Sequence, residues 1–239
     1  MILPLLTSAC LLLSSASPSE ILEHVDKAAT RASDATITLG VSVSAPGRAA
    51  LSRTLRIWQR GDGYRLVKFL EPARLRGTGI LVREGQTYLY SRAYDRVRRI
   101  AGLAGGGSFM GTGFSIDDLA RVRYAGDYTA ALDAETGAVW TLLLTPRETA
   151  EHSHAYLRLE VRKQDHLLQK LEALDSEKAV LRTIQASDFR TVGGYPVAHR
   201  LEVVEHRTDK RTVATVSEIV FDSGLSLDDF TTRALRRGR

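Results

Sequence analysis

The chain has 239 residues, 44% hydrophobic and 26% charged, which excludes a disordered chain or a repetitive fibre and predicts one folded body. Its single cysteine, Cys10, lies in the apolar leader, so a disulfide, a thiol nucleophile and a thiolate metal site are excluded for the mature protein. The formal net charge is +5, and basic residues cluster only at residues 96–99 and 233–239. Because nucleic-acid-binding proteins concentrate charge on one face and interleave aromatic residues, we expect no nucleic-acid partner. The charge favours at most a weak attraction to anionic headgroups or an acidic partner.

Residues 1–16, MILPLLTSACLLLSSA, form an uncharged apolar leader that ends in small residues. Ser14 and Ala16 stand at the −3 and −1 positions of a signal-peptidase site, so we expect export and a mature chain that begins near Ser17. The apolar run is too short for a membrane span, which needs about 20 residues. Two alternatives stay open. One is lipidation at Cys10; the other is an uncleaved or wrongly assigned start, because no Lys or Arg precedes the run.

After the leader, the sequence predicts one helix followed by strands. Apolar residues at 3.6-residue spacing predict an amphipathic helix over residues 19–34, with Ser19 as its N-cap. Alternation of apolar with small or polar residues over 36–43 predicts a strand. The runs 51–60 and 64–70 flank a Gly-Asp-Gly turn, which is typical of an antiparallel hairpin.

The rest of the chain contains more short strand candidates separated by turns. They are residues 79–83, 86–91, 121–131, 138–146, 155–163, 167–174, 180–189, 197–206 and 212–221. No βαβ alternation is visible, so we expect about eleven antiparallel strands in a meander that curls because a wide sheet twists. Residues 155–162 alternate leucine or valine with arginine or glutamate, which predicts one face in contact with solvent.

Residues 97–119 do not follow this pattern of short strands separated by turns. They contain five glycines between Gly105 and Gly113, then a short helix near Ser115, whose hydroxyl is placed to cap Asp118. Four large apolar side chains occur along the segment: Leu103, Phe109, Met110 and Phe114. Large apolar groups on a loop are either buried or form a site. The segment is therefore either a plug that fills the core or a mobile lid over an apolar cavity.

A cavity is expected because one helix and one short lid cannot cover the apolar rows of so wide a sheet. We assign its wall to residues on the predicted strands. They are Ile57, Phe69, Leu143 and Leu159.

No sequence motif supports catalysis or cofactor binding. The glycine-rich segment lacks the Lys-Ser/Thr of a phosphate-binding loop, and Ser108 lacks the glycine spacing of a nucleophile elbow. His152 and His154 share the spacing of a metal half-site but lack an obvious third ligand, so we expect a solvated loop. Asp117 and Asp118 are better explained by helix capping than by acid–base chemistry. We therefore expect no enzymatic activity, catalytic residue, metal or cofactor.

Several short motifs resemble a known family over nearly the whole mature chain, residues 17–239. They are Phe69-Leu-Glu-Pro72, Leu75-Arg-Gly77-Thr-Gly79-Ile-Leu81, Tyr88-Leu-Tyr90, Arg96-Val-Arg98-Arg99-Ile100, Ser108-Phe-Met-Gly111-Thr-Gly-Phe114-Ser-Ile-Asp-Asp118-Leu119, Phe189-Arg190, Gly194-Tyr195-Pro196, Phe221-Asp222 and Phe230-Thr-Thr-Arg-Ala-Leu235. The sequence resembles the outer-membrane lipoprotein-sorting protein family, the LolA-like group.

The resemblance implies an unclosed antiparallel half-barrel closed by helices, in a periplasmic carrier. Its apolar cavity would take lipoprotein acyl chains or another lipid for transfer toward the outer membrane, from an inner-membrane donor to an outer-membrane acceptor. We expect a monomer. The best-studied chaperone branch is shorter and lacks the segment from Phe109 to Ser115, so its contacts with an extraction machine and a receptor are not carried over. A sensor or interaction module on the same scaffold, with a filled core and a peptide-binding edge, is the alternative.

Overall fold

The computed structural model describes residues 16–100, 108–121, 123–148 and 153–237. The helical elements are α1 (Pro18–Ala29), η1 (Arg92–Tyr94), η2 (Phe109–Gly111), α2 (Ile116–Ala120), η3 (Leu227–Phe230) and α3 (Thr232–Arg237), where η denotes a 3-10 turn. The strands are β1 (Asp34–Ala45), β2 (Arg48–Arg60), β3 (Tyr64–Glu71), β4 (Gly79–Arg83), β5 (Gln86–Ser91), β6 (Arg96–Ile100), β7 (Tyr128–Glu135), β8 (Val139–Pro146), β9 (Tyr156–Arg162), β10 (Leu168–Leu174), β11 (Val180–Val192), β12 (Tyr195–Glu205) and β13 (Lys210–Phe221).

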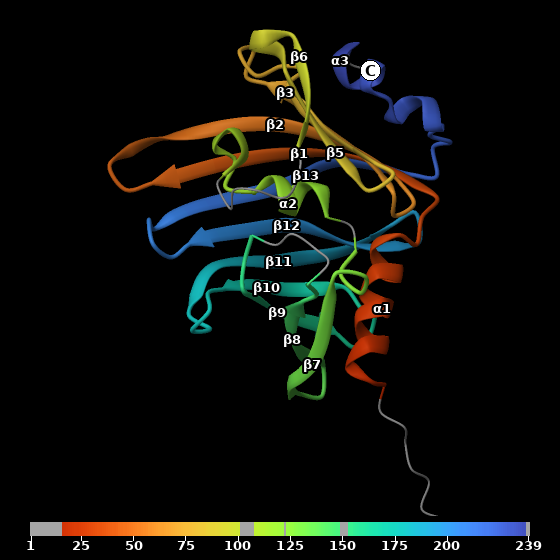
Figure 1. Ribbon diagram of the computed structural model, residues 1–239, viewed down its shortest axis with the longest axis vertical. Helices are drawn as coiled ribbons and strands as arrows, with labels where there is room; N and C mark the ends of the chain where they lie inside the picture. Colours follow the sequence, from red (N-terminus) through yellow and green to blue (C-terminus); the bar gives the residue numbers. More distant parts are fainter. Residues whose placement is uncertain (1–15, 101–107, 122, 149–152, 238–239) are drawn as a thin grey trace, which may run out of the picture.

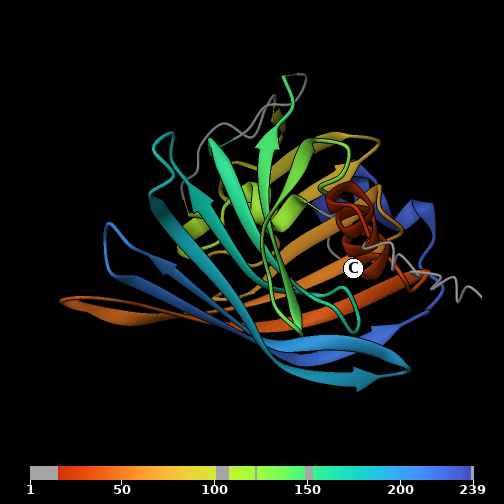
Figure 2. The ribbon, with the colours of Figure 1, turned by 90° about the horizontal axis from the view of Figure 1, so that it is seen from below.

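All thirteen strands form one antiparallel sheet in the order β6-β5-β4-β3-β2-β1-β13-β12-β11-β10-β9-β8-β7. The sheet curves around α1 and α2 without closing on itself (Figure 2). This confirms the predicted unclosed half-barrel. It corrects two details of the prediction. The sheet has thirteen strands instead of about eleven, and it consists of two meanders joined where β1 pairs with β13.

Consecutive strands β6 and β7 lie at opposite edges of this sheet, so the chain between them has to cross from one edge to the other. The described part of that connection contains η2 and α2, which lie in front of the concave face (Figure 1). The topology therefore places the predicted lid or plug over the hollow of the half-barrel.

The concave face carries two apolar clusters. One lies beneath η2 and α2 and is built from β1 to β4 together with Val203 and Ala214. The other lies beneath α1, where Ile21, Leu22 and Val25 pack against inward side chains of β7 to β10. Both clusters follow from strict alternation along the strands, because residues two apart share a face.

Helix α1 begins and ends earlier than the sequence predicts. Its N-cap is Ser17, whose Oγ accepts from the amide of Glu20, while the Glu20 carboxylate accepts from the Ser17 amide at 2.7 Å. Pro18 then fits the first turn, where its missing N–H costs nothing. The helix ends at Ala29, and Asp34 already begins β1.

The convex face has its own cluster, which no sequence pattern predicts. The C-terminal segment folds back so that Phe230 and Leu235 pack against Trp58 and neighbouring outward side chains of β3 to β5. Asp34 anchors the turn, accepting from the amides of residues 223–225 at 2.8–3.0 Å. Burial opposes ionisation of Asp34, but the hydrogen bonds from Ser223 and its neighbours outweigh it and lower the pKa. Within the described part of the chain, no helix is long and apolar enough to cross a membrane.

Candidate functional site

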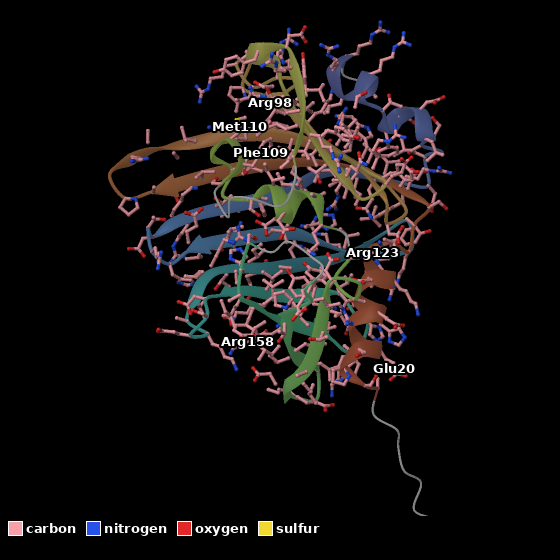
Figure 3. The ribbon with its side chains drawn as sticks, viewed as in Figure 1. Glu20, Arg98, Phe109, Met110, Arg123 and Arg158 are labelled. Atoms are coloured by element: carbon pink, nitrogen blue, oxygen red, sulfur yellow. The ribbon has the colours of Figure 1, made fainter. Side chains whose placement is uncertain are left out.

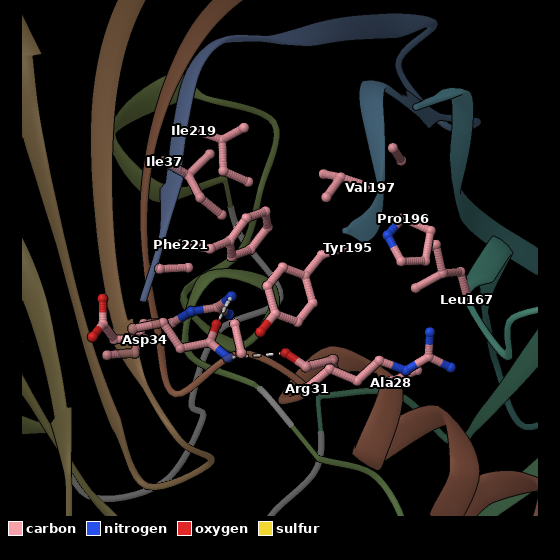
Figure 4. A pocket seen from close by; sticks show the side chains of 16 residues that line it. Ala28, Arg31, Asp34, Ile37, Leu167, Tyr195, Pro196, Val197, Ile219 and Phe221 are labelled. Carbon is pink, nitrogen blue, oxygen red and sulfur yellow. Dashed lines mark hydrogen bonds between the residues drawn. The ribbon is translucent and has the colours of Figure 1, made fainter. Parts of the chain in front are cut away.

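Among the described residues, two cavities with mainly apolar walls lie on the concave face. The first, of about 200 Å³, is enclosed by the end of α1, by β1, β12 and β13, and by the turn before β10 (Figure 4). Its wall is mainly apolar, and the labelled side chains of Ile37, Val197, Ile219, Phe221 and Leu167 surround it. An apolar wall of this kind suits hydrocarbon. Five polar residues line the cavity as well: Arg31, Asp34, Gln59, Arg65 and Tyr195.

A half-buried cation, Arg65, lines this first cavity. Its guanidinium donates to Gln59 Oε1 at 2.8 Å and to the carbonyl oxygens of Leu119 and Arg121 at 3.3 and 3.0 Å. Burial lowers the pKa of Arg65 to about 10. Arg65 therefore ties the end of α2 to β3 through backbone oxygens, and no ion pair joins it to a carboxylate within the described residues.

The second cavity, of about 170 Å³, lies between α2 and strands β10 to β12. Its apolar wall is formed by Leu168, Leu171, Ile184 and Leu201, and Phe114 also lines it. Leu167 lines the first cavity, and Leu168, the next residue of the chain, lines the second. Both cavities are thus bounded by the same turn into β10.

Residues 108–121, which we call the cover segment, hold their place partly by apolar contacts. Phe109, Phe114 and Leu119 are all buried in the cluster beneath η2 and α2. The Phe109 ring is 5% exposed and lies 5.6 Å from the ring of Phe69 on β3. Met110, the next residue, is 37% exposed. The cover segment therefore fills part of the hollow, and its tip reaches solvent.

Polar contacts also hold α2 in place. Asp118 forms a two-pronged ion pair with Arg182 of β11, with both N–O distances 2.7 Å and side chains only 11% and 7% exposed. Arg121 bridges Asp117 at 2.8 Å and Asp127 at 2.6 Å. Ser115 caps the helix together with Asp118, as the sequence predicts. Removing one partner of such a buried carboxylate–guanidinium pair is costly, because it leaves an uncompensated charge.

A close backbone approach fixes the cover segment against β13. Gly113 has φ +80°, and a Cβ built on it would lie 2.0 Å from Thr212 Oγ1, so only glycine fits. Gly111 also has a positive φ, +78°, but a Cβ there would meet nothing nearer than Arg53 Nη2 at 3.7 Å.

The residues predicted for the lid have different environments. Phe109 and Phe114 are buried, Met110 is exposed, and Leu103 lies outside the described residues. The motif glycines Gly77 and Gly79 lie outside the cover segment, at the β3–β4 hairpin. Gly77 has φ +84°, and a Cβ on Gly79 would lie 2.2 Å from the Val67 carbonyl oxygen. Tight backbone geometry accounts for both of them.

The residues predicted for the cavity wall also lie in different parts of the structure. Ile57 and Phe69 belong to the cluster beneath the cover segment, and Leu159 to the cluster beneath α1. None of the three lines either of the two cavities. Leu143 is placed wrongly by the sequence, because its cross-strand partner is Arg158, which contacts Asp133 and Glu172 on the convex face. Its neighbours Leu142 and Leu144 face inward instead.

The polar anchors Arg65 and Arg182 were missed. A sequence signal for Arg182 exists: it has the same parity as Ile184 and Ala186, so alternation places a charge on the apolar face. A charged residue in such a position needs a buried partner, and Asp118 supplies it.

His154 lies beside this anchor, and His152 lies outside the described residues. The His154 ring lines a space of about 20 Å³ with Asp118, Arg121 and Arg182, and its nitrogens have no hydrogen-bond partner in the described part of the chain. Burial and the neighbouring Arg182 lower the pKa of His154. Across the described ranges, no group of three or more His, Cys, Asp or Glu residues is arranged to hold a metal ion.

The sequence matches one family model. A family model with the description "-like: Uncharacterized protein" matches residues 61–237. The chain belongs to this family. No curated protein matches the sequence.

Solved structures show the same architecture. A DUF1329 family protein from Desulfovibrio piger has a TM-score of 0.83 at 24% identity, over 92% of this chain and 100% of that one. A putative outer membrane lipoprotein-sorting protein domain from Vibrio parahaemolyticus has a TM-score of 0.79 at 24% identity, over 92% and 98%. A LolA superfamily protein from Nitrosomonas europaea has a TM-score of 0.77 at 18% identity, over 92% and 100%. The fold of the chain is therefore LolA-like, as the motifs predict.

Proposed function

We propose that this LolA-like protein is a periplasmic carrier that holds the acyl chains of a lipoprotein, or another lipid, in the hollow beneath the cover segment. The observation that carries the proposal is the apolar concave face, which retains two cavities beside the cover segment instead of a solid core. The lipoprotein-sorting domain from Vibrio parahaemolyticus, which shares the fold, supports lipoprotein as one cargo. An inner-membrane donor and an outer-membrane acceptor are its proposed partners.

The cavities as they stand are smaller than a ligand of this kind requires. Small-molecule pockets usually enclose about 300–1,000 Å³, whereas these hold about 200 and 170 Å³. Phe109, Phe114 and Leu119 of the cover segment fill part of the concave face, and Phe114 also lines the second cavity. Displacement of the cover segment would therefore add the needed space.

Recognition would rest on the hydrocarbon chain, with the headgroup secondary. The hollow offers apolar area and few fixed polar groups, and each buried methylene contributes about 0.8 kcal/mol. We expect affinity for fatty acids to rise with chain length until the hollow is full. We expect only a modest effect of salt, because apolar contacts are not screened and the charged groups that line the first cavity are Arg31, Asp34 and Arg65.

The test is displacement of a fluorescent fatty acid by unlabelled acids of increasing length, with solvent extracts of detergent-free periplasmic protein analysed by mass spectrometry. Co-purifying lipid and rising affinity would support the carrier. The Phe114→Ala variant should bind long acids more tightly, because Phe114 closes one cavity. A matched control is Leu225→Ala, which truncates a buried apolar residue of the convex-face cluster, away from both cavities.

The alternative is an interaction module on the same scaffold. The observation that favours it is the degree to which Phe109 and Phe114 already fill the hollow. Such a module would give an affinity independent of chain length, no extracted lipid, and binding that collapses at high salt. That result would reject the carrier.

A further inference from the structure

An open groove of about 710 Å³ lies on the other face of the sheet, between the β5–β6 edge and α3. We call it the outer groove. Five arginines and one carboxylate line it together with Tyr88, Val97 and Thr232: Arg96, Arg99, Arg233, Arg236, Arg237 and Asp95. Figure 1 places β6 and α3 together at the end of the molecule remote from the start of α1, and Figure 3 shows Arg98 on the same hairpin.

The positive charge of the outer groove is not neutralised by the protein. Arg236 lies 3.9 Å from Asp95, and both side chains are more than half exposed. No ion pair joins the other four arginines of the groove to an acidic residue within the described ranges. Elsewhere on the convex face the arrangement differs, since Arg158 contacts both Asp133 and Glu172 at 3.0 Å. A cluster of uncompensated like charges destabilises a compact protein, so a ligand of opposite charge would relieve it.

Packing holds these charges in place. Leu235 is fully buried in the convex-face cluster, which fixes α3 on the sheet. Lys68 on β3 donates to the Ala234 carbonyl oxygen at 3.0 Å, and Arg236 donates to the Asp95 carbonyl oxygen at 3.3 Å. The arginines of α3 and of β6 therefore face one opening as parts of a rigid surface.

An exposed aromatic ring stands next to this surface. Tyr94, in η1 and directly before Asp95, is 82% exposed. Tyrosine is enriched where a bilayer meets water, and clustered arginines attract anionic lipids. A soluble phosphate would instead need converging, buried donors, whereas Arg96, Arg99, Arg233 and Arg237 are all exposed.

We propose that the outer groove is a docking surface for a bilayer that carries anionic phospholipid headgroups. The groove and the hollow lie on opposite faces of the sheet. Docking through the outer groove would therefore leave the cover segment free of the bilayer. This inference goes beyond the proposed cargo function and does not depend on it.

The test is co-sedimentation of the full chain with phosphatidylcholine vesicles, with and without phosphatidylglycerol, at low and high salt. We expect binding only to anionic vesicles, and loss of binding at high salt. Each arginine near a bilayer strengthens binding roughly fivefold. Replacing the four unpaired groove arginines with Gln should then weaken binding by about 600-fold. These changes are Arg96→Gln, Arg99→Gln, Arg233→Gln and Arg237→Gln.

The matched control removes four exposed arginines of the β11–β13 region, with the same change in net charge: Arg190→Gln, Arg200→Gln, Arg207→Gln and Arg211→Gln. It should bind anionic vesicles nearly as the wild type does. Equal losses in both variants, or a wild type that ignores anionic vesicles, would overturn the proposal. If the fourfold groove variant unfolds, the pair Arg96→Gln and Arg99→Gln on the edge strand serves, with about 25-fold weakening expected. Fatty-acid displacement run on every variant keeps failure of docking distinct from failure of the carrier.

Discussion

Truncation of Phe109 to alanine should lower the stability of the lipid-free protein and increase the stabilisation that lipid binding provides. Phe109 is 5% exposed and packs against Phe69 in the cluster beneath the cover segment. Phe-to-Ala changes in such positions cost about 3–5 kcal/mol, because they lose buried area and leave a cavity. In a carrier whose cargo replaces this ring, the new cavity lies where the acyl chain goes. Lipid should therefore stabilise the variant more than the wild type.

The control is the adjacent Met110→Ala. Met110 is 37% exposed, so its truncation should change stability by only about 0.5 kcal/mol. The assay is urea unfolding followed by circular dichroism, on lipid-free protein and with excess palmitate. Each tenfold gain in affinity adds about 1.4 kcal/mol to the stability of the loaded protein. The unfolding free energies of the variants, with and without palmitate, can therefore be compared directly in kcal/mol.

Two results would refute this reasoning. If Phe109→Ala costs no more than Met110→Ala, the ring is not a core residue, and its buried position does not stabilise the fold. If it costs several kcal/mol but palmitate stabilises both variants equally, the ring fills a space that cargo never enters. In that case the interaction module becomes the better explanation.

The remaining predictions concern the attachment of the cover segment. Gly113→Ala should lose about 2 kcal/mol or more, because its Cβ would meet Thr212 Oγ1 at 2.0 Å, whereas Gly111→Ala has a similar φ and room for the methyl group. Urea unfolding of the two variants separates the clash from the backbone strain that they share. Burial lowers the pKa of His154, so the unfolded chain takes up more protons and stability should fall as pH drops below about 6.5. His154→Gln should lessen this loss between pH 7.5 and 5.5; an unchanged slope in unfolding free energy would assign the loss to other groups.

The parts of the fold that the sequence predicts well are those determined locally. Alternation between Leu157 and Val161 fixes which side of β9 is buried, and the spacing of Ser115 and Asp118 fixes a helix start. The predicted N-cap of α1 was wrong by two residues because Ser19 competes with Ser17, and the capping box that Ser17 forms with Glu20 decides between them.

The parts that the sequence did not predict depend on contacts between distant segments. The strand β6 is rich in arginine and has no apolar face of its own, so only pairing with β5 shows it to be a strand. The pairing of β1 with β13 joins the two meanders, and nothing local to either strand specifies it. The same holds for Arg182, whose role depends on Asp118, a residue 64 positions earlier in the chain.

The attachment of the cover segment sets a threshold for the cargo that can displace it. Three side chains, Phe109, Phe114 and Leu119, leave the core when the segment lifts, at a cost of about 1.5–3 kcal/mol each. A hydrocarbon chain recovers about 0.8 kcal/mol per buried methylene, so roughly six to eleven methylenes are needed before insertion becomes favourable. Separation of Asp118 from Arg182 would raise that number. Affinity should therefore stay near zero for short acids and then rise steeply, whereas a preformed open pocket would give a steady rise from the shortest chain.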